Sequence, residues 1–301
     1  MAIELSGKVA IVTGAGGGLG RAHALALASR GAKVVVNDLG GARDGTGGSA
    51  TAAEKVVDEI RKAGGEAIAN GASVTDYAAV EAMVAEAMKK WGRVDILVNN
   101  AGILRDKTFA KMEIDDFRAV IDVHLMGAVH TTKAVWEIMR AQNYGRIIMT
   151  TSSSGLYGNF GQSNYGAAKM ALVGLMQTLS LEGAKHNIRV NCLAPTAATR
   201  MTEGLMPPEV LARLKPEAVS PAIVYLASDG APTRAILCAG AGSFERAYIT
   251  LTPGAFLGSG NGAADELAAK IETISSRKGD IVPDSAMDQG RIEITNAQKA
   301  G

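Results

Sequence analysis

The chain has 301 residues, of which 47% are hydrophobic and 20% are charged, and its formal net charge is +1. This length supports a full hydrophobic core, and the small charge gives no electrostatic reason to expect nucleic acid or an anionic membrane as partner. Two cysteines, an N-terminus unlike a signal peptide and no apolar run of membrane-spanning length together favour a reduced, cytoplasmic protein.

Short apolar runs alternate with helix-length segments along most of the chain. Continuous apolar character is typical of strands in a parallel sheet covered on both faces, and it predicts strands at residues 9–13, 33–38, 96–98, 146–150 and 188–193. Helices are expected near 19–30, 50–63, 76–91, 113–141 and 163–186. This order predicts one α/β domain of the Rossmann type over residues 1–255, a doubly wound parallel sheet with helices on both faces. Ligands bind such sheets at the carboxyl ends of the strands.

Two stretches depart from this alternation. Residues 39–49 form a glycine-rich loop that is longer than an ordinary strand–helix connection. Residues 256–301 are expected to form a C-terminal extension, in which 265–274 are compatible with one amphipathic helix and the remainder is polar. No internal repeat is present, and no metal site is predicted.

The first predicted strand runs into the glycine cluster Thr13-Gly-Ala-Gly-Gly-Gly-Leu-Gly20. Gly14 permits a tight turn, while Gly18 and Gly20 let the backbone approach a pyrophosphate at the N-terminus of the helix that begins near Leu19. A glycine cluster alone is often only a loop. Its position between a strand and a helix favours a nucleotide site.

Asp38 ends the second predicted strand, about twenty residues after the glycine cluster. A carboxylate there accepts hydrogen bonds from ribose hydroxyls and repels a 2′-phosphate, so NAD is favoured over NADP. The alternative is a turn-forming aspartate before Gly40 and Gly41. Arg43 is the residue that would reverse the cofactor preference.

Tyr165 and Lys169 lie at positions i and i+4 of a predicted helix, which puts both side chains on one face. A neighbouring ammonium favours the phenolate and lowers the pKa of a tyrosine, so Tyr165 becomes a proton donor and acceptor for an alcohol oxygen. Ser152 follows the fifth strand and is placed to hold that oxygen. Singly, a Tyr–Lys pair is usually a surface contact and a serine-rich turn usually closes a strand.

Together these motifs resemble the short-chain dehydrogenase/reductase family over about residues 5–245: Thr13-Gly-x-x-x-Gly18-x-Gly20, Asn99-Asn-Ala-Gly102, Ser152, Tyr165-x-x-x-Lys169 and Leu193-Ala-Pro195. The resemblance implies Ser152, Tyr165 and Lys169 as the catalytic residues. The glycine cluster, Asp38 and this resemblance together predict a set of cofactor contacts. They are Gly14, Gly18, Leu19, Gly20, Asp38, Ser73, Val74, Asn99, Ala101, Gly102, Tyr165, Lys169, Pro195 and Thr199.

The family's fourth catalytic position, an asparagine that supports a proton relay, corresponds to His124 in this chain. An imidazole can also hold a water or pass a proton. A buried structural histidine is the equal alternative.

Within the family, several segments are similar to the (3R)-hydroxyacyl-CoA dehydrogenase unit of peroxisomal multifunctional enzyme type 2, also called 17β-hydroxysteroid dehydrogenase type 4, and to its stand-alone bacterial relatives. These segments are Asn37-Asp-Leu-Gly-Gly41 with the loop after it, Ala101–Asp106, Val123-His-Leu125 and Tyr157–Gly161. The subgroup also has histidine at the relay position. The similarity implies NAD-dependent oxidation of an (R)-3-hydroxyacyl-CoA, with a 17β-hydroxysteroid or another cyclic alcohol as the rival substrate.

Residues of the remaining chain are compatible with either substrate. An apolar cover is expected over residues 196–216 from Met201, Leu205, Met206, Leu211 and Leu214, and basic residues that can meet CoA phosphates, or simply face solvent, are Arg105, Lys107, Arg200 and Arg213. The resemblance also implies a homodimer or homotetramer that uses the helices at 113–141 and 163–186, although these can equally pack within one chain. A cofactor-sensing protein without catalysis is the non-enzyme alternative.

Overall fold

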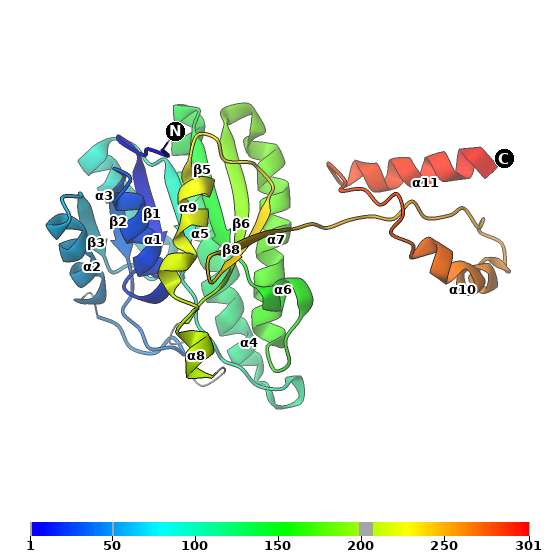
Figure 1. Cartoon of the computed structure of the whole chain (residues 1–301), viewed down its shortest axis with the longest axis horizontal. Helices are drawn as coiled ribbons and strands as arrows, with labels where there is room; N and C mark the ends of the chain where they lie inside the picture. The colour runs from blue at the N-terminus through cyan, green and yellow to red at the C-terminus, as the bar shows by residue number, and fades with distance from the viewer. Residues whose placement is uncertain (1, 50, 199–206, 301) are drawn as a thin grey trace. The chain divides into compact units, whose positions relative to one another are not determined.

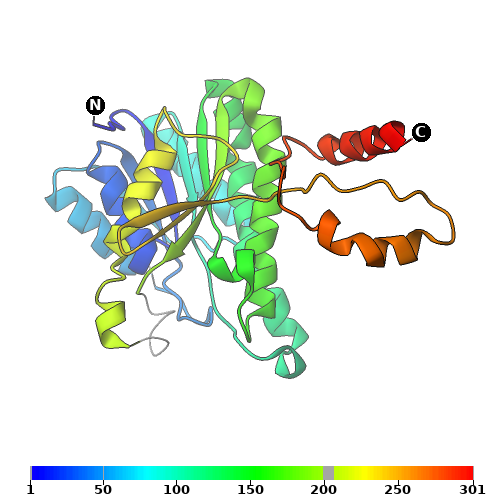
Figure 2. The same ribbon diagram turned by 45° about the vertical axis from the view of Figure 1, so that its right-hand side comes forward.

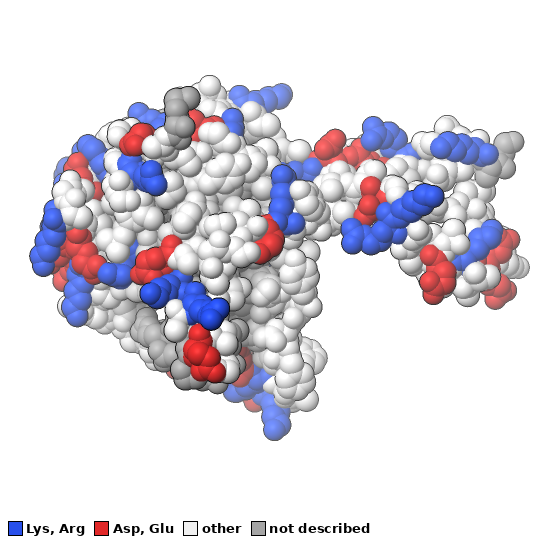
Figure 3. Space-filling model, viewed as in Figure 1, with Lys and Arg blue, Asp and Glu red and all other residues white. Residues whose placement is uncertain are grey.

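The structure is a computed structural model that describes residues 2–49, 51–198 and 207–300. The chain packs as two units, Met1–Arg246 and Ala247–Gly301, so the boundary expected at residue 255 falls inside the second unit. Within the described ranges, no helix has both the length and the apolar character needed to cross a bilayer. On the face shown in Figure 3, Lys and Arg side chains are interspersed with Asp and Glu, as the small net charge suggests.

The first unit is built on an eight-stranded sheet with the order β3-β2-β1-β4-β5-β6-β7-β8. Its strands are β1 (Val9–Thr13), β2 (Lys33–Asn37), β3 (Ala67–Asn70), β4 (Ile96–Asn99), β5 (Gly145–Thr150), β6 (Ile188–Thr196), β7 (Ile236–Gly240) and β8 (Ser243–Ala247). All pairs from β3 to β7 are parallel, so their carboxyl ends meet at one edge. The strand order reverses between β1 and β4, which is where such sheets bind ligands. The expected doubly wound α/β fold is confirmed.

Helices cover both faces of this sheet (Figures 1 and 2). The elements are α1 (Gly18–Ala28), α2 (Thr51–Lys62), α3 (Tyr77–Trp91), α4 (Ile114–Ile121), α5 (Gly127–Gln142), α6 (Ser153–Tyr157), α7 (Ser163–Gly183), α8 (Pro208–Leu211) and α9 (Ser220–Ala227). Helix α1 contacts α2 and α9 in one layer, while α3 contacts α5, and α4 contacts α7, in the other. The main core cluster lies between the first layer and the sheet, and alternate apolar residues of β1 and β2 point into it.

Several elements have no counterpart among the predictions. Strand β3 is only four residues long, and β7 and β8 form a hairpin around Ala241 and Gly242, which both have positive φ (51° and 82°). Helix α9 is apolar nearly all round because it is buried against α1, so it lacks the amphipathic period that marks a surface helix.

The single helix expected near residues 113–141 is interrupted. Helices α4 and α5 are joined by a π-helical turn over Asp122–Met126. Such turns often occur at functional sites, because the wider turn re-aims one side chain. Here the re-aimed residue is His124, whose side chain is 4% exposed.

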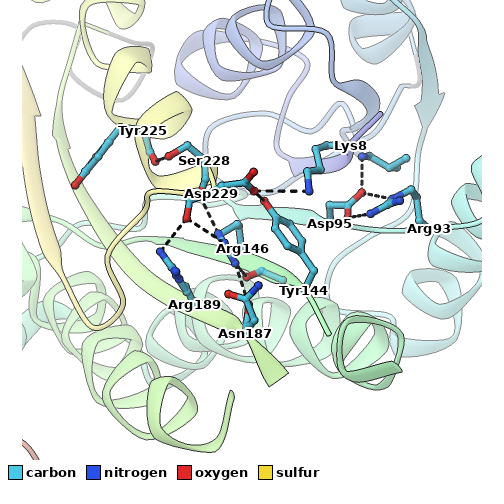
Figure 4. Close-up of polar contacts among 12 residues, drawn as sticks. Lys8, Arg93, Asp95, Tyr144, Arg146, Asn187, Arg189, Tyr225, Ser228 and Asp229 are labelled. Atoms are coloured by element: carbon cyan, nitrogen blue, oxygen red, sulfur yellow. Dashed lines mark hydrogen bonds and ion pairs between the residues drawn. The ribbon is translucent and has the colours of Figure 1, made fainter. Parts of the chain in front are cut away.

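A polar network lies where the strands begin, at the edge opposite to their carboxyl ends (Figure 4). Arg146 in β5 is 1% exposed, and its guanidinium donates to the carbonyls of Ser228 (2.9 Å) and Asn187 (2.9 Å). Tyr144 donates its hydroxyl to Asp229 (2.8 Å), and its ring lies 4.2 Å from the Arg146 guanidinium carbon. The network therefore joins the start of β5 to the residues that follow α9.

The second unit contains α10 (Ala263–Ile274) and α11 (Met287–Ala300). An antiparallel bridge between Leu251 and Ile281 and a hydrogen bond from Asn296 Nδ2 to Pro253 O (2.9 Å) tie its segments together. Helix α10 matches the amphipathic segment expected at 265–274, whereas α11 was not anticipated because its sequence is largely polar.

Candidate active site

The glycine cluster forms the turn between β1 and α1 at the carboxyl edge of the sheet. Gly14 has a φ of 61°, and a Cβ built there would lie 2.8 Å from the Cα of Ala101, so only glycine fits. Helix α1 begins at Gly18, one residue before the expected start. Because the first backbone N–H groups of a helix have no partner within it, this turn suits an anionic diphosphate.

Asn100 joins this turn to the segment after β4. Its side chain donates to the carbonyls of Thr13 (2.9 Å) and Gly14 (3.1 Å), while Thr13 Oγ1 accepts from the backbone N–H groups of Asn100 and Ala101 (both 3.0 Å). Asn100 and Thr13 were not among the predicted site residues. The paired asparagines at 99–100 were the available signal, but the sequence does not show which of the two faces the turn.

Asn99, which was predicted to contact the cofactor, points instead into the protein. It is 6% exposed, and its amide is hydrogen-bonded to Thr132 Oγ1 (3.1 Å) and Thr131 of α5. In this structure its side chain therefore fastens β4 to α5. Contact between Asn99 and a cofactor stays a prediction.

Asp38 lies directly after β2 and faces the glycine turn. One carboxylate oxygen accepts the N–H of Gly16 (2.7 Å) and the other accepts the N–H of Gly40 (2.6 Å). A Cβ at Gly16 would lie 2.8 Å from the carboxylate, whereas a Cβ at Gly17 would meet nothing within 4 Å. The turn is thus tight toward Asp38 and open beyond Gly17, a shape that fits an adenosine diphosphate with its ribose beside Asp38.

The remaining predicted cofactor residues extend this edge. Ser73 and Val74 follow β3, where Val74 O accepts from His130 Nδ1 (2.9 Å) and the Val74 side chain packs against Gly127. Pro195 lies near the end of β6. Thr199, together with Arg200, Met201, Leu205 and Met206 of the expected cover, lies outside the described residues.

Three side chains predicted to act in catalysis meet at the same edge. Ser152 follows β5 and caps α6, accepting the N–H of Ser154 (3.1 Å), and its hydroxyl is hydrogen-bonded to the side chain of Tyr165. Tyr165 and Lys169 lie one turn apart on α7, with Lys169 Nζ 5.4 Å from the centre of the tyrosine ring. Lys169 Nζ also donates to Thr150 O (2.6 Å).

Burial is the main influence on the pKa values of Lys169 and Tyr165. It lowers the pKa of Lys169 to about 7, because the ammonium loses its solvation. Burial also raises the pKa of Tyr165, while the hydrogen bond from Ser152 acts in the opposite direction and Asp106 adds to the rise. The expected lowering of the Tyr165 pKa by the ammonium is therefore not the net effect of the protein's own groups.

His124 stands edge-on to Tyr165, with the ring centres 5.2 Å apart. Its Nε2 lies 2.8 Å from Ile103 O and 3.1 Å from Ile103 N, and its Nδ1 has no partner among the described residues. Burial and the nearby Lys169 hold the pKa of His124 well below its ordinary value, so the ring is neutral. A neutral imidazole that donates through Nε2 to Ile103 O keeps Nδ1 as an acceptor.

Gly102 explains how the ring fits. A Cβ there would overlap His124 Cε1 and lie 3.0 Å from Nδ1. The imidazole therefore fits only because residue 102 has no side chain, and a side chain at Gly102 would force the ring to move.

A further pair of residues positions Tyr165. Asn164 is completely buried, and its side chain donates to Arg105 O (3.0 Å) and accepts the N–H of Tyr165 (2.7 Å). Gln162, the residue that precedes α7, donates to Asp106 (2.7 Å). Sequence reasoning missed both residues, since amide side chains at the beginning of a helix are common and do not by themselves indicate a site.

A family model described as short chain dehydrogenase matches residues 8–209 of the chain. A short-chain type dehydrogenase/reductase of Mycobacterium tuberculosis is 52% identical over 82% of this chain and 87% of that protein. Peroxisomal multifunctional enzyme type 2 of Drosophila melanogaster is 56% identical, and the peroxisomal hydratase-dehydrogenase-epimerase of Saccharomyces cerevisiae 55% identical, each over 75% of this chain. The chain spans only 38% and 25% of the length of these two multifunctional proteins.

Solved structures show the same relationship. Full-length peroxisomal multifunctional enzyme type 2 from Drosophila melanogaster covers 99% of this chain with a TM-score of 0.81 and 36% identity, and half of that protein is matched. A 7α-hydroxysteroid dehydrogenase complexed with NADH and 7-oxo glycochenodeoxycholic acid covers 80% of this chain with a TM-score of 0.71 and 32% identity, and 95% of that protein is matched.

Proposed function

The chain belongs to the short-chain dehydrogenase family, and from this membership we propose that it is an NAD-dependent oxidoreductase that converts an (R)-3-hydroxyacyl-CoA to the 3-ketoacyl-CoA. The observation that carries the proposal is the hydrogen bond between Ser152 and Tyr165, with Lys169 one helical turn away, at the sheet edge that also holds the glycine turn. NAD, when bound, supplies the hydride acceptor.

The side chains then have separate tasks. Tyr165 takes the proton from the alcohol oxygen, and Ser152 donates a hydrogen bond to the same oxygen and orients it. Lys169, already directed to Thr150 O, provides a positive charge beneath the tyrosine ring when it is protonated. With a positively charged nicotinamide bound nearby, the phenolate of Tyr165 would be favoured further, which would oppose the rise in pKa that burial of Tyr165 produces.

We assign to His124 the place of the relay residue. Because the ring is neutral, it does not deliver a proton by ionising. Its Nδ1, which has no partner among the described residues, is instead the atom available to accept a hydrogen bond in a relay behind Tyr165. The bond to Ile103 fixes the direction in which Nδ1 points.

The carboxylate of Asp38 supports the choice of NAD. A 2′-phosphate placed beside it would meet like charge in a turn that is already narrow at Gly16. We expect kcat/KM to be higher with NAD than with NADP, and Asp38→Ala to narrow the difference. Preference of the unaltered protein for NADP would contradict this assignment.

The substrate class rests on the identity of 55–56% to the yeast and fly multifunctional proteins. The structural likeness to a 7α-hydroxysteroid dehydrogenase supports a steroid or other cyclic alcohol as the second candidate. We further propose a homodimer or homotetramer through α5 and α7, because Met170 and Leu181 on α7 are 40% and 52% exposed.

The decisive experiment is a turnover screen with NAD. It compares (R)- and (S)-3-hydroxyacyl-CoAs of increasing chain length with 17β-hydroxysteroids and simple secondary alcohols, following NADH absorbance. We expect the (R)-thioesters to give the highest kcat/KM. Faster turnover of steroids would favour the second candidate. Tight NAD binding without turnover of any alcohol would instead indicate a cofactor-sensing protein.

A further inference from the structure

A cavity of about 600 Å³ opens beside the candidate active site, between the glycine-rich loop after β2 and the segment after β4. Its volume lies in the range of about 300–1,000 Å³ that is typical of pockets for ligands larger than a single ion. It does not include Ser152, Tyr165 or Lys169. Its lining is almost entirely charged and consists of Arg43, Asp44, Leu104, Arg105, Asp106, Lys107 and Asp116.

Two basic side chains of this cavity, Arg105 and Lys107, are held in place before any ligand binds. Asp116 on α4 pairs with Arg105 through one oxygen (3.1 Å) and with Lys107 through the other (2.9 Å). Arg105 also donates to the backbone carbonyl of Asp44 (3.1 Å), and Leu104 N donates to Arg43 O (3.0 Å). Restricting long side chains in this way reduces the entropy that a ligand must remove on binding.

The carboxylates of the cavity are engaged by the protein. Asp44 accepts from the backbone and hydroxyl of Thr46 (3.0 and 2.8 Å), and Asp106 accepts from Gln162. Arg105 uses Nε and Nη1 in its bonds, and no hydrogen bond from its Nη2 is recorded within the described part of the chain. A guanidinium edge and an ammonium that share one carboxylate are suited to phosphate oxygens, which accept several charge-assisted bonds at once.

One wall of the cavity is rigidly joined to the catalytic tyrosine. Arg105 contributes its side chain to the cavity and its carbonyl to Asn164, which in turn accepts the N–H of Tyr165. Asp106 is joined to Gln162 in the turn before α7. A ligand held by Arg105 and Lys107 therefore sits in a fixed relation to Tyr165, so binding energy gained far from the reacting carbon helps to orient it.

We propose that this cavity binds the phosphorylated adenosine end of the coenzyme A carrier. The inference rests on the proposed hydroxyacyl-CoA dehydrogenase function and assigns the part of the substrate that lies away from the reacting carbon. It also gives the glycine-rich loop a task, since that loop supplies Arg43 and Asp44 to the cavity.

The test measures carrier binding and turnover separately. Binding of adenosine 3′,5′-bisphosphate is measured by calorimetry on the full chain saturated with NAD, which excludes occupation of the cofactor site. Turnover is measured with (R)-3-hydroxybutyryl-CoA and with the N-acetylcysteamine thioester of the same acid, which has no phosphate. The variants are Lys107→Glu and Arg43→Ala. The control is Arg118→Ala, an exposed cation of α4 whose partner Asp115 also lies outside the cavity.

We expect Lys107→Glu to weaken bisphosphate binding and to lower kcat/KM for the CoA thioester about tenfold or more, equivalent to about 1.4 kcal/mol. Arg43→Ala should act in the same direction, the N-acetylcysteamine thioester should be little affected, and Arg118→Ala should match the unaltered protein. Equal losses on both thioesters, or bisphosphate binding that the variants leave unchanged, would overturn the proposal for the cavity. If the unaltered protein turns over neither thioester, the proposed function fails. Bisphosphate binding and its loss in the variants then still test whether the cavity binds the phosphorylated adenosine.

Discussion

The two ends of strand β5 carry buried polar groups of opposite kinds. At its start, the guanidinium of Arg146 is surrounded by backbone carbonyls, with Tyr144 and Asp229 beside it (Figure 4). At its end, Lys169 Nζ bonds to Thr150 O, whereas Thr150 Oγ1 and His124 Nδ1 have no partner among the described residues.

This difference between the two ends of β5 indicates that one end contributes to stability and the other to function. Polar groups that are fully hydrogen-bonded are costly to disturb and gain nothing from a ligand. Buried groups with spare acceptors or shifted pKa values are costly to keep and are typical of sites that bind or react. Changes at the start of β5 should therefore affect unfolding, and changes at its end should affect turnover.

The largest effect is expected at the end of β5 that lies beside Ser152, Tyr165 and Lys169, called the catalytic end below. Tyr165→Phe removes the phenol oxygen that we propose as acceptor of the substrate proton but keeps the ring against His124, so kcat should fall by about 10²–10⁴-fold. The affinity for NADH, measured by fluorescence titration, and the melting temperature should remain close to those of the unaltered protein. Turnover at an undiminished rate would show that Tyr165 is not the acid–base group.

Arg146→Met tests the opposite end. It leaves the carbonyls of Ser228 and Asn187 without their donor, so the free energy of unfolding should fall by about 3 kcal/mol. Urea denaturation measures this change, and Arg140→Met, at an exposed ion pair on α5, serves as the control. A loss of turnover without loss of stability would break the distinction between the two ends.

The contact between Gly102 and His124 links stability to function within the catalytic end. Gly102→Ala should cost about 1–3 kcal/mol through overpacking against the imidazole. The cost should be smaller in a His124→Ala background, because the overlapping ring is gone. A double-mutant cycle measures the free energy of unfolding in the two backgrounds. If Gly102→Ala cost the same in both, its destabilisation would not come from overlap with the His124 ring.

His23 in α1 tests whether a buried nitrogen without a hydrogen-bond partner is by itself a sign of function. Its Nε2 has no partner among the described residues, although it lies away from the catalytic end. Its Nδ1 pairs with Ser220 Oγ (2.9 Å), and burial lowers its pKa to about 3. The unfolded chain takes up a proton below the ordinary pKa of 6.5, whereas the folded chain does so only near 3. Stability is therefore fully present above pH 6.5 and decreases as the pH falls toward 3, by at most about 1.4 kcal/mol per pH unit.

His23→Gln should flatten that dependence, measured as urea midpoints from pH 7 to pH 4, without changing kcat at neutral pH. His186→Gln, in the turn after α7, is the matched control. A large fall in kcat for His23→Gln would mean that an unpartnered buried nitrogen marks function even away from the end of β5.

Most of the correct predictions of strands and site residues came from patterns within short stretches of sequence. The apolar runs of β1, β2, β4, β5 and β6, the glycine turn after β1 and the four-residue spacing of Tyr165 and Lys169 are all visible within a few residues of sequence. The double winding followed from their alternation with helices, and the structure confirms it. The elements that were missed, β3, β7, β8, α6, α8, α9 and α11, are short, buried all round or largely polar, and so lack a distinctive period.

By itself, then, the sequence determined the fold, the family and the placement of the glycine turn, Ser152, Tyr165 and Lys169 at the carboxyl edge of the sheet, because these depend on local spacing and on the direction of parallel strands. Only the tertiary structure decided that Asn100 faces the glycine turn while Asn99 faces α5, that a π-helical turn directs His124 at Tyr165, and that Asn164 joins Arg105 to α7. Each of these joins residues more than twenty positions apart in the chain or depends on how one helix packs against another. Whether a polar side chain is satisfied or left with a spare acceptor is determined by such distant partners, which no local pattern contains.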